Sequence, residues 1–290
     1  MLKIFSLIIY KILKFINKIF FFITNRSFIQ WLIFFLQRDS YLNMKIKDKN
    51  IQLFSPNNLI SWRIRTMFDK EPDTIEWIKK FKVENNRKVI FWDIGANIGL
   101  YSIYNSLKNK NSISFAFEPS SSNLRVLTRN ISINNLESKI KVLPFALTNY
   151  DNVFQTMNEG QFTEGGALNT FGKEYNFEGK KFRSSMKYNI YGTSINYLVK
   201  NSILNIPDYI KIDVDGIEHL IIKGGDKILH NKKIKSISIE INENFKEQYK
   251  KIISLMYKFN FKLLHKKHNE QMFSKKNKFN KVYNYLFIKK

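Results

Sequence analysis

The segment FWDIGANIGLYS at residues 91–102 constrains the fold of this chain more than any other. It begins inside an apolar run, VIFW at residues 89–92, of the kind shown by a strand that is buried on both faces. Two glycines follow at once, and glycine is needed where the backbone takes a positive φ or comes close to a ligand. The segment therefore predicts a buried strand ending at Asp93, a tight turn, and a helix beginning near Leu100. Ligands of such sheets bind beyond the carboxyl ends of the strands, so the turn is the expected cofactor site.

Strands and helices alternate along the chain from this point. The candidate strands are Val89–Asp93, Ser112–Phe117, Ile140–Ala146, Tyr209–Ile212, Ile234–Ile241, Lys262–His265 and Tyr283–Ile288. Helical patterns cover Thr74–Phe81, Leu100–Lys108, Ser122–Asn135, Gly216–Lys223 and Phe245–Phe259. This alternation predicts βαβ units and an α/β fold with a doubly wound, mostly parallel, seven-stranded sheet. Residues 44–60 suggest a hairpin with its turn at Pro56–Asn58.

Residues 151–192 do not follow the alternation. They are rich in glycine, asparagine and aromatic residues, as expected of a long insertion over the ligand face of the sheet. We expect this insertion to form the acceptor pocket, with Gly165, Gly166, Asn169, Phe171, Tyr175 and Phe177 as its candidate lining residues.

Residues 1–37 are apolar and aromatic with scattered lysines. Lysines interrupt the first half of this segment and Asn25–Arg26 interrupts the second, so no stretch reaches the ~20 apolar residues of a spanning helix, and a simple transmembrane anchor is disfavoured. On a helix over residues 3–18, however, Lys3, Lys11, Lys14 and Lys18 fall within an arc of roughly 80°. That layout predicts a helix lying on an anionic membrane surface. The alternative is a helical extension that packs on protein.

We therefore divide the chain into a basic apolar helical segment, residues 1–40, and a catalytic domain, residues 41–290. Residues 1–40 contain neither alanine nor glycine, so no cleavable signal peptide is expected. The absence of cysteine excludes a disulfide framework and thiolate zinc sites, and it fits a reducing compartment. We expect a cytoplasmic protein, peripheral at the inner face of the membrane. Its oligomeric state is left open.

The formal net charge of +24 would attract nucleic acid, anionic lipids or acidic substrates. The basic residues are scattered, however, and an AT-rich coding sequence explains the charge equally well.

A second acidic position supports a nucleoside-containing cofactor. The strand that ends in Phe117 is followed by Glu118 and Pro119, and Glu118 stands 25 residues after Asp93. A carboxylate at this place accepts both hydroxyls of an adenosyl ribose. The glycine turn lacks the G-x-G-x-x-G spacing of nicotinamide-dependent dehydrogenases, which disfavours that class.

Several ordered motifs resemble the FkbM family of methyltransferases that use S-adenosylmethionine. They are DIGANIGLYS, FEPSSSNLRVLTRNISINNL, VLPFALTN and YIKIDVDGIEHLIIKGG, within residues 71–243. The resemblance implies a class I methyltransferase fold of the Rossmann-like type and methylation of a hydroxyl group, commonly on a sugar, polyketide or lipid-linked glycan, of which we expect a sugar or lipid-linked glycan here. It also implies roles for nine cofactor-binding residues: the methionine end would contact Asp93, Gly95, Asn97 and Gly99, the ribose Glu118, and the adenine Pro119, Ser120, Ala146 and Leu147.

The last motif gathers carboxylates and an imidazole at the end of a strand, beside the expected methyl group. Asp213 is the first candidate for the general base, with Asp215 and His219 behind it. Asp213 could equally support the cofactor or cap the next helix, and Glu218 could be a surface acid of its first turn. The family usually has Glu where Asp215 stands. Glu240 and Glu243 follow the apolar stretch Ile234–Ile239 of the next strand and suit substrate contact or solvent alike. We predict no metal site, although a divalent cation at these acids is an alternative.

Two other functions are alternatives for this chain. A nucleic-acid methyltransferase would suit the charge, but base N-methylation often uses an Asn/Asp-Pro-Pro-aromatic loop where this chain has Asp213–Gly216, and carboxylates repel phosphates. The non-enzyme alternative is a membrane-associated protein that binds a ligand without turnover.

Overall fold

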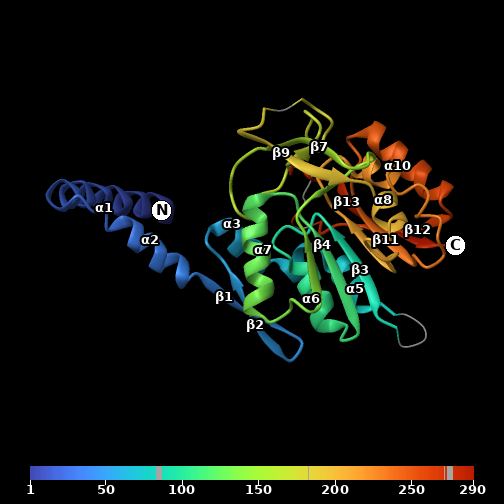
Figure 1. Cartoon of the computed structure of the whole chain (residues 1–290), viewed down its shortest axis with the longest axis horizontal. Helices are drawn as coiled ribbons and strands as arrows, with labels where there is room; N and C mark the ends of the chain where they lie inside the picture. The colour runs from blue at the N-terminus through green and yellow to red at the C-terminus, as the bar shows by residue number, and fades with distance from the viewer. Residues whose placement is uncertain (83–86, 182, 271, 273–276) are drawn as a thin grey trace. The chain divides into compact units, whose positions relative to one another are not determined.

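The computed structural model describes residues 1–82, 87–181, 183–270, 272 and 277–290. It divides into two compact units, Met1–Leu42 and Asn43–Lys290, which are described separately (Figure 1).

The first unit is a helical hairpin of α1 (Leu2–Thr24) and α2 (Ile29–Arg38). α1 ends at Asn25, which takes the left-handed conformation with φ 53°. The side-chain oxygen of Asn17 accepts hydrogen bonds from the backbone N–H groups of Phe28 at 2.9 Å and Ile29 at 3.2 Å, which ties α1 to the start of α2. Neither helix has a buried residue. A helix long and apolar enough to span a bilayer is not found among the described residues.

The second unit contains the predicted seven-stranded sheet, in the order β12-β13-β11-β10-β3-β4-β5. Its strands are β3 (Val89–Ile94), β4 (Ser112–Phe117), β5 (Ile140–Leu143), β10 (Tyr209–Ile212), β11 (Ser236–Asn242), β12 (Phe261–Lys267) and β13 (Val282–Lys289). β13 runs antiparallel to both of its neighbours, β11 and β12, and the other six strands all run in one direction. The predicted fold class, a class I methyltransferase sheet of the doubly wound α/β type, is confirmed.

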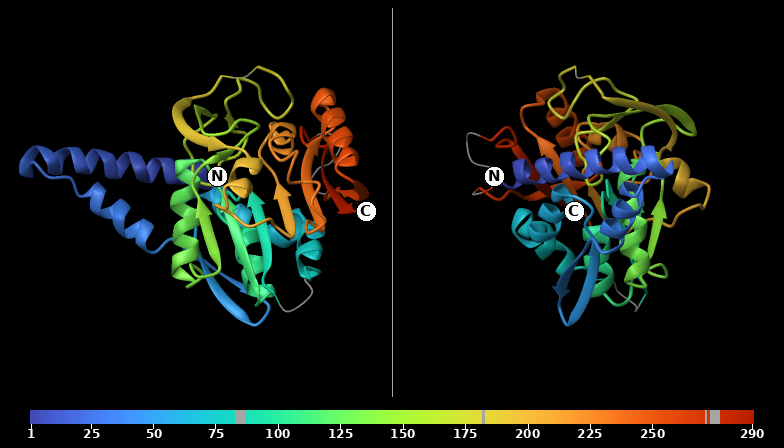
Figure 2. Two further views of the ribbon diagram at one scale, coloured as in Figure 1. Left: turned by 45° about the vertical axis from the view of Figure 1, so that its right-hand side comes forward. Right: turned by 90° about the vertical axis from the view of Figure 1, so that its left-hand side faces the viewer.

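The direction of chain winding reverses between β3 and β10, which are adjacent strands. From β3 the chain passes through α6 (Leu100–Lys108) to β4 and through α7 (Ser121–Ile133) to β5. From β10 it passes in the opposite direction through α9 (Glu218–Lys223) to β11, and then through α10 (Lys246–Lys258) to β12. Because these crossovers are right-handed, α6 and α9 lie on opposite faces of the sheet (Figures 1 and 2). The carboxyl ends of β3 and β10 therefore border the crevice where ligands of such sheets bind.

The central strands are buried as their apolar runs predict. Phe91 and Trp92 of β3 and Ile210 and Ile212 of β10 are all 0% exposed. The exception to this apolar pattern is Lys211, a buried cation in the middle of β10, which is 2% exposed. Its charge needs partners at that depth, because an isolated buried charge is strongly destabilising.

A second, four-stranded sheet covers the carboxyl ends of the first (Figures 1 and 2). It consists of β6 (Ala146–Leu147), β7 (Val153–Glu159), β8 (Thr170–Phe171) and β9 (Met186–Thr193). The strand predicted over Ile140–Ala146 is thus split: the chain leaves the main sheet after Leu143, at Pro144, which has no N–H to donate to a ladder. The strands within the insertion were not predicted from the sequence.

The predicted hairpin exists, but its turn lies elsewhere. β1 (Tyr41–Ile46) and β2 (Lys49–Phe54) are joined at Lys47, where φ is 56°. The segment Pro56–Asn58 instead opens α3 (Asn58–Arg65): the side chain of Asn57 accepts from the backbone N–H of Ile60 at 3.0 Å and caps the helix. The remaining helices are α4 (Met67–Lys70), α5 (Pro72–Lys79) and α8 (Ile195–Lys200).

Candidate active site

The turn after β3 lies against the loop after β10. A Cβ added to Gly95 would stand 1.8 Å from the carbonyl oxygen of Asp213, and the φ of Gly95 is +83°. Gly99 has φ +87°, and a Cβ there would stand 2.4 Å from a methyl carbon of Leu127. Both predicted glycines are therefore required by conformation and by space.

Three cavities meet at Gly95, which lines each of them. The apolar cavity, about 40 Å³, is lined by Pro119, Ala146 and Leu147 together with Phe117 and Phe171. The polar cavity, about 50 Å³, is lined by Asn97, Tyr101, Lys211 and Asp213 among others. The large cavity, about 590 Å³, is lined by Asn97, Asp213, Asp215 and Glu240, by Trp62 and Arg63 of α3, and by residues 166–168 of the insertion.

Glu118 is held at the end of β4 by the turns on either side. Its carboxylate accepts hydrogen bonds from the backbone N–H groups of Asn97 at 2.7 Å and Ser120 at 2.9 Å, and from the amide of Asn123 at 3.4 Å. It is 5% exposed, and burial raises the pKa of Glu118 to about 7. Ser120 caps α7, where its hydroxyl accepts from the backbone N–H of Asn123.

Two buried acceptor oxygens near the glycine turn have no hydrogen-bond partner among the described residues. They are Oδ1 of Asp93 and Oδ1 of Asn97. The other oxygen of Asp93 accepts from the hydroxyl of Ser102 at 2.7 Å, and burial raises the pKa of Asp93. Unsatisfied buried acceptors are rare, and a water molecule, an ion or a ligand can supply the missing donor. The ammonium of an amino acid is such a donor, so this turn fits the methionine end of S-adenosylmethionine.

A chain of ion pairs runs through the polar cavity. The ammonium of Lys211 lies 2.7 Å from Asp213 and 3.9 Å from Glu71, and Glu71 pairs with Lys70 at 2.9 Å. Burial by itself would raise the pKa of Asp213, but Lys211 outweighs it and holds that pKa below the ordinary range. In the same way Lys70 and Lys211 outweigh burial and lower the pKa of Glu71.

The insertion is attached to the site by side chains of the catalytic core. Asp215, in the left-handed conformation with φ 62°, accepts a hydrogen bond from the backbone N–H of Leu168 at 2.7 Å. The amides of Asn97 and Asn123 donate to the carbonyl of Gly166 at 2.7 and 3.1 Å. Burial, and next Asp213, raise the pKa of Asp215 to about 6.

His219, predicted as a third candidate base, does not line any of the three cavities. Its ring lies edge-on to Phe245, and its Nδ1 is 3.4 Å from the amide of Gln248. Burial lowers the pKa of His219 to about 4. Glu218 is also turned away: it accepts from the backbone N–H groups of Val214 and Gly216 at 3.3 and 3.1 Å and so fixes the loop after β10.

The candidate lining residues of the insertion are divided between cavities. Gly166 lines the large cavity, whereas Asn169 and Phe171 line the apolar one. Tyr175 packs against Phe245, and Phe177 packs against Phe279.

The acid–base set of the site includes residues that received no role from the sequence: Lys70, Glu71 and Lys211. Carboxylate oxygens of Glu71, Asp213 and Glu240 all lie within 4.8 Å of one another. Glu71 precedes Asp213 by more than a hundred residues, so no local spacing could have joined them. The signal for Lys211 was available: a lone cation in an apolar strand, two residues before Asp213.

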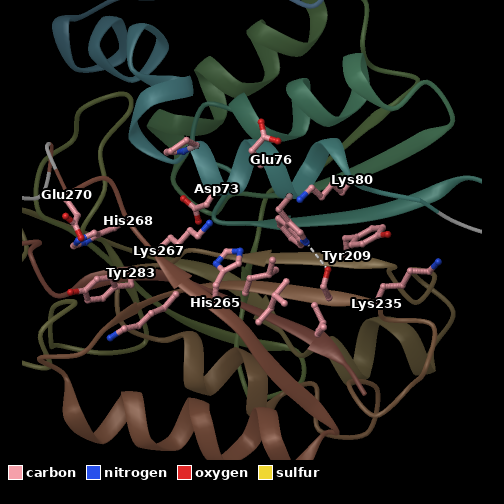
Figure 3. Close-up of a pocket in the computed structure, with 17 residues that line it drawn as sticks. Asp73, Glu76, Lys80, Tyr209, Lys235, His265, Lys267, His268, Glu270 and Tyr283 are labelled. Carbon is pink, nitrogen blue, oxygen red and sulfur yellow. Dashed lines mark hydrogen bonds between the residues drawn. The ribbon is translucent and has the colours of Figure 1, made fainter.

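A separate groove of about 670 Å³ lies where α5 faces β12 and β13 (Figure 3). Asp73 of α5 and His265 of β12 point into it, with Lys267 nearby. None of the predicted site residues lines this groove.

The sheet order and the turn at its switch point define a class I methyltransferase. The family model of the methyltransferase FkbM domain matches residues 93–263, and the chain belongs to this family. The methyl donor of this family is S-adenosylmethionine.

Three solved structures illustrate the structural similarity. The methyltransferase FkbM from Methylobacillus flagellatus KT is 11% identical with a TM-score of 0.45, over 80% of this chain and 61% of that one. Precorrin-6y C5,15-methyltransferase from Geobacter metallireducens GS-15 is 15% identical with a TM-score of 0.42, over 76% and 87%. M. capricolum TrmK in complex with S-adenosylhomocysteine is 16% identical with a TM-score of 0.41, over 74% and 67%. No curated protein matches the sequence.

Proposed function

We propose that this protein transfers the methyl group of S-adenosylmethionine to a hydroxyl group of a sugar or lipid-linked glycan. The observation that carries the proposal is the meeting of three cavities at Gly95. Two are small and suit the ends of one elongated cofactor, and the third is large, open to an acceptor and lined by carboxylates. The glycan part of the proposal rests on the resemblance to the FkbM family.

Five of the nine proposed cofactor-binding residues line these cavities, namely Gly95, Asn97, Pro119, Ala146 and Leu147, whereas Asp93, Gly99, Glu118 and Ser120 lie behind the cavity walls. Pro119, Ala146 and Leu147 would pack on the adenine in the apolar cavity, and the carboxylate of Glu118 would accept from the ribose hydroxyls. The unpaired oxygens of Asp93 and Asn97 would accept from the amino group of the methionine end. Gly95 and Gly99 would shape the turn beneath the cofactor, and Ser120 would fix its side of the site by capping α7.

Bound S-adenosylmethionine supplies a methyl group on a sulfonium cation, which an aligned nucleophile displaces. The protein's task is to orient the acceptor, exclude water and remove the hydroxyl proton. Asp213 and Asp215 line the large cavity and would be available there for acid–base work, whereas His219 does not line it. The ion pair with Lys211 would orient Asp213, and Asp215 would hold the insertion over the acceptor.

The alternatives are a nucleic-acid methyltransferase and a ligand-binding protein without turnover. Against the first stand the carboxylates of Asp213, Asp215 and Glu240 in the large cavity, which would repel phosphates. The ligand-binding protein would have the same cofactor site as the methyltransferase and would differ from it only in lacking turnover.

The first unit, residues 1–42, carries a further part of the proposal: it would lie on an anionic membrane surface at the inner face of the membrane. Many of its large apolar side chains are exposed, among them Ile9 at 41% and Phe22 at 91%. It has six basic residues and one acidic residue. A bilayer surface would cover the apolar faces and pair its anionic head groups with the lysines. Binding of the full chain to lipid vesicles tests this.

The first experiment is calorimetric titration of the full chain, in mild detergent, with S-adenosylmethionine. We expect binding that weakens by at least about tenfold in both Asp93→Ala and Glu118→Ala, because each removes an acceptor of the cofactor. Glu76→Ala, an exposed acid of α5 outside the three cavities, serves as the matched control. A folded wild-type protein that does not bind would refute the methyltransferase proposal; binding without methyl transfer to any glycan would favour the protein without turnover.

A further inference from the structure

We propose that Glu240, rather than Asp213, is the catalytic base that accepts the proton of the acceptor hydroxyl. This inference rests on the proposed function, which leaves the base open.

Strand register places Glu240 beside Asp213 at the edge of the sheet. Ile239 of β11 pairs with Ile212 of β10 in parallel register, so the next residues along both strands stand side by side. Both carboxylates line the large cavity, and Glu240 is half-buried there. Glu240 and Asp213 thus face the same large cavity, in which the acceptor would lie next to the glycine turn.

The three neighbouring carboxylates differ in their partners. Asp213 is bound to Lys211 at 2.7 Å, and Glu71 is bound to Lys70 at 2.9 Å. Within the described part of the chain, the Glu240 side chain forms neither a hydrogen bond nor an ion pair. Two lysines thus neutralise two carboxylates, and the third is left free to exchange a proton.

The electrostatics agree with this division. Burial, and next the negative charge of Asp213, raise the pKa of Glu240 well above its usual range; Glu71 and Asp215 act in the same direction and Lys70 opposes them. Asp213 is instead held ionised by Lys211, and a carboxylate with a lowered pKa is a weak base. General base catalysis is most effective when the pKa of the base lies near the working pH.

The step balances without any further reactant. The acceptor oxygen forms the new C–O bond, the S–CH₃ bond breaks and leaves its electron pair on sulfur, and the hydroxyl proton passes to a carboxylate oxygen of Glu240. Lys211 and Lys70 stay protonated throughout and keep Asp213 and Glu71 ionised.

An acidic set of this kind can also suggest a divalent cation. Here Lys211 and Lys70 already form ion pairs with Asp213 and Glu71, and the positive charges of the two lysines would repel a metal ion. The experiment therefore includes Mg²⁺ as a separate arm.

The test uses the full chain labelled with ¹³C at the glutamate carboxyl carbons, in complex with S-adenosylhomocysteine. A carboxyl NMR titration between about pH 5 and 9, with Glu240→Gln to assign the signal, measures the pKa of this group directly. We expect the pKa of Glu240 to lie well above that of an ordinary glutamate, and to move back toward the ordinary range in Asp213→Asn, which removes the like charge.

The Glu240→Gln variant also separates catalysis from cofactor binding. By calorimetry, Glu240→Gln should bind S-adenosylhomocysteine within about twofold of wild type. Its turnover, on the acceptor found by the glycan assay, should fall by at least about 100-fold, and Glu240→Asp should restore part of it.

Glu243→Gln is the matched control. Glu243 comes directly after β11 and three residues after Glu240, but it is bound to Lys266 at 2.6 Å and does not line the large cavity, so its loss should leave turnover unchanged.

Three results would overturn the inference. Glu240 could be ionised over the whole pH range, its signal could shift with millimolar MgCl₂, or Glu240→Gln could lose cofactor binding. The first would return the role to Asp213 or Asp215, the second would make the cluster a metal site, and the third would make Glu240 a cofactor ligand. Failure of the wild-type protein to bind S-adenosylhomocysteine would overturn the proposed function as well, and calorimetry shows this independently of the titration.

Discussion

At position 95 the backbone leaves room for glycine alone. The residue combines a positive φ with the closest approach between the β3 turn and the β10 loop, and it borders all three cavities. A side chain here would separate the turn from the carbonyl of Asp213, and with it the cofactor site from the acceptor site.

We therefore expect Gly95→Ala to lower the free energy of unfolding by at least about 1 kcal/mol, because alanine is strained at positive φ and its Cβ would clash with backbone. The measurement is urea unfolding followed by tryptophan fluorescence. Gly160→Ala is the matched control, since a Cβ there meets no atom within 4 Å; it should change stability by less than about 0.5 kcal/mol. Equal stability of the two variants would show that the turn yields to a side chain.

At the scale of elements, α1 gathers its lysines on one side of the helix, and none of its residues is buried. Lys11, Lys14 and Lys18 lie near one another on the helix, and they line one shallow hollow together with Phe15 and Phe21. A helix with no buried residue gains nothing from a protein core, so its stability in water depends on what covers its apolar side chains.

If a membrane surface covers it, the full chain should float with vesicles containing anionic phosphatidylglycerol, and much less with vesicles of phosphatidylcholine alone. Each lysine near such a surface is worth about 1 kcal/mol, so reversing Lys11, Lys14 and Lys18 to Glu should weaken binding at least about tenfold. Reversal of three exposed lysines of the second unit, Lys246, Lys250 and Lys258, is the matched control. Self-association without vesicle binding would show that the helices pack on protein instead.

At the scale of the whole molecule, the site is rich in buried carboxyl groups whose pKa values burial has raised. Glu118 and Glu218 reach about 7, and Asp215 reaches about 6. In the folded state these groups bind protons at a pH where the unfolded chain has lost them. The stability they contribute is therefore greatest at the acid end of this window and is lost as pH rises through the folded-state values.

Glu218 gives the clearest test, because it is 2% exposed and lines none of the three cavities. Relative to Glu218→Gln, whose side chain is neutral at every pH, the wild-type protein should lose about 1 kcal/mol of unfolding free energy between pH 6 and 8. Urea unfolding of both proteins at the two pH values measures this. Taking the difference cancels His219, whose lowered pKa acts in the opposite direction in both proteins. A difference that does not change with pH would mean that Glu218 is ionised when folded.

The sequence by itself determined the elements and their order. Val89–Trp92, the glycine turn and the helix after it depend on local patterning, and so do Ser112–Phe117 and Tyr209–Ile212, whose predicted bounds match the structure. Right-handed crossovers then leave few arrangements for such a chain, which is why the doubly wound fold and the place of its cofactor turn could be predicted.

Only the tertiary structure decided which side chains meet. The site joins Lys211 of β10, Glu240 of β11 and Glu71, which lies between α4 and α5. Which of them meet depends on the register of the two strands and on how these helices pack against the sheet. Depth of burial and opposite charge then set their proton affinities, so Asp213 and Glu240 differ as acids although each comes directly after a run of apolar strand residues. The sequence shows such strand-end acids as equals because desolvation and ion pairing are properties of three-dimensional neighbours, which local spacing does not record.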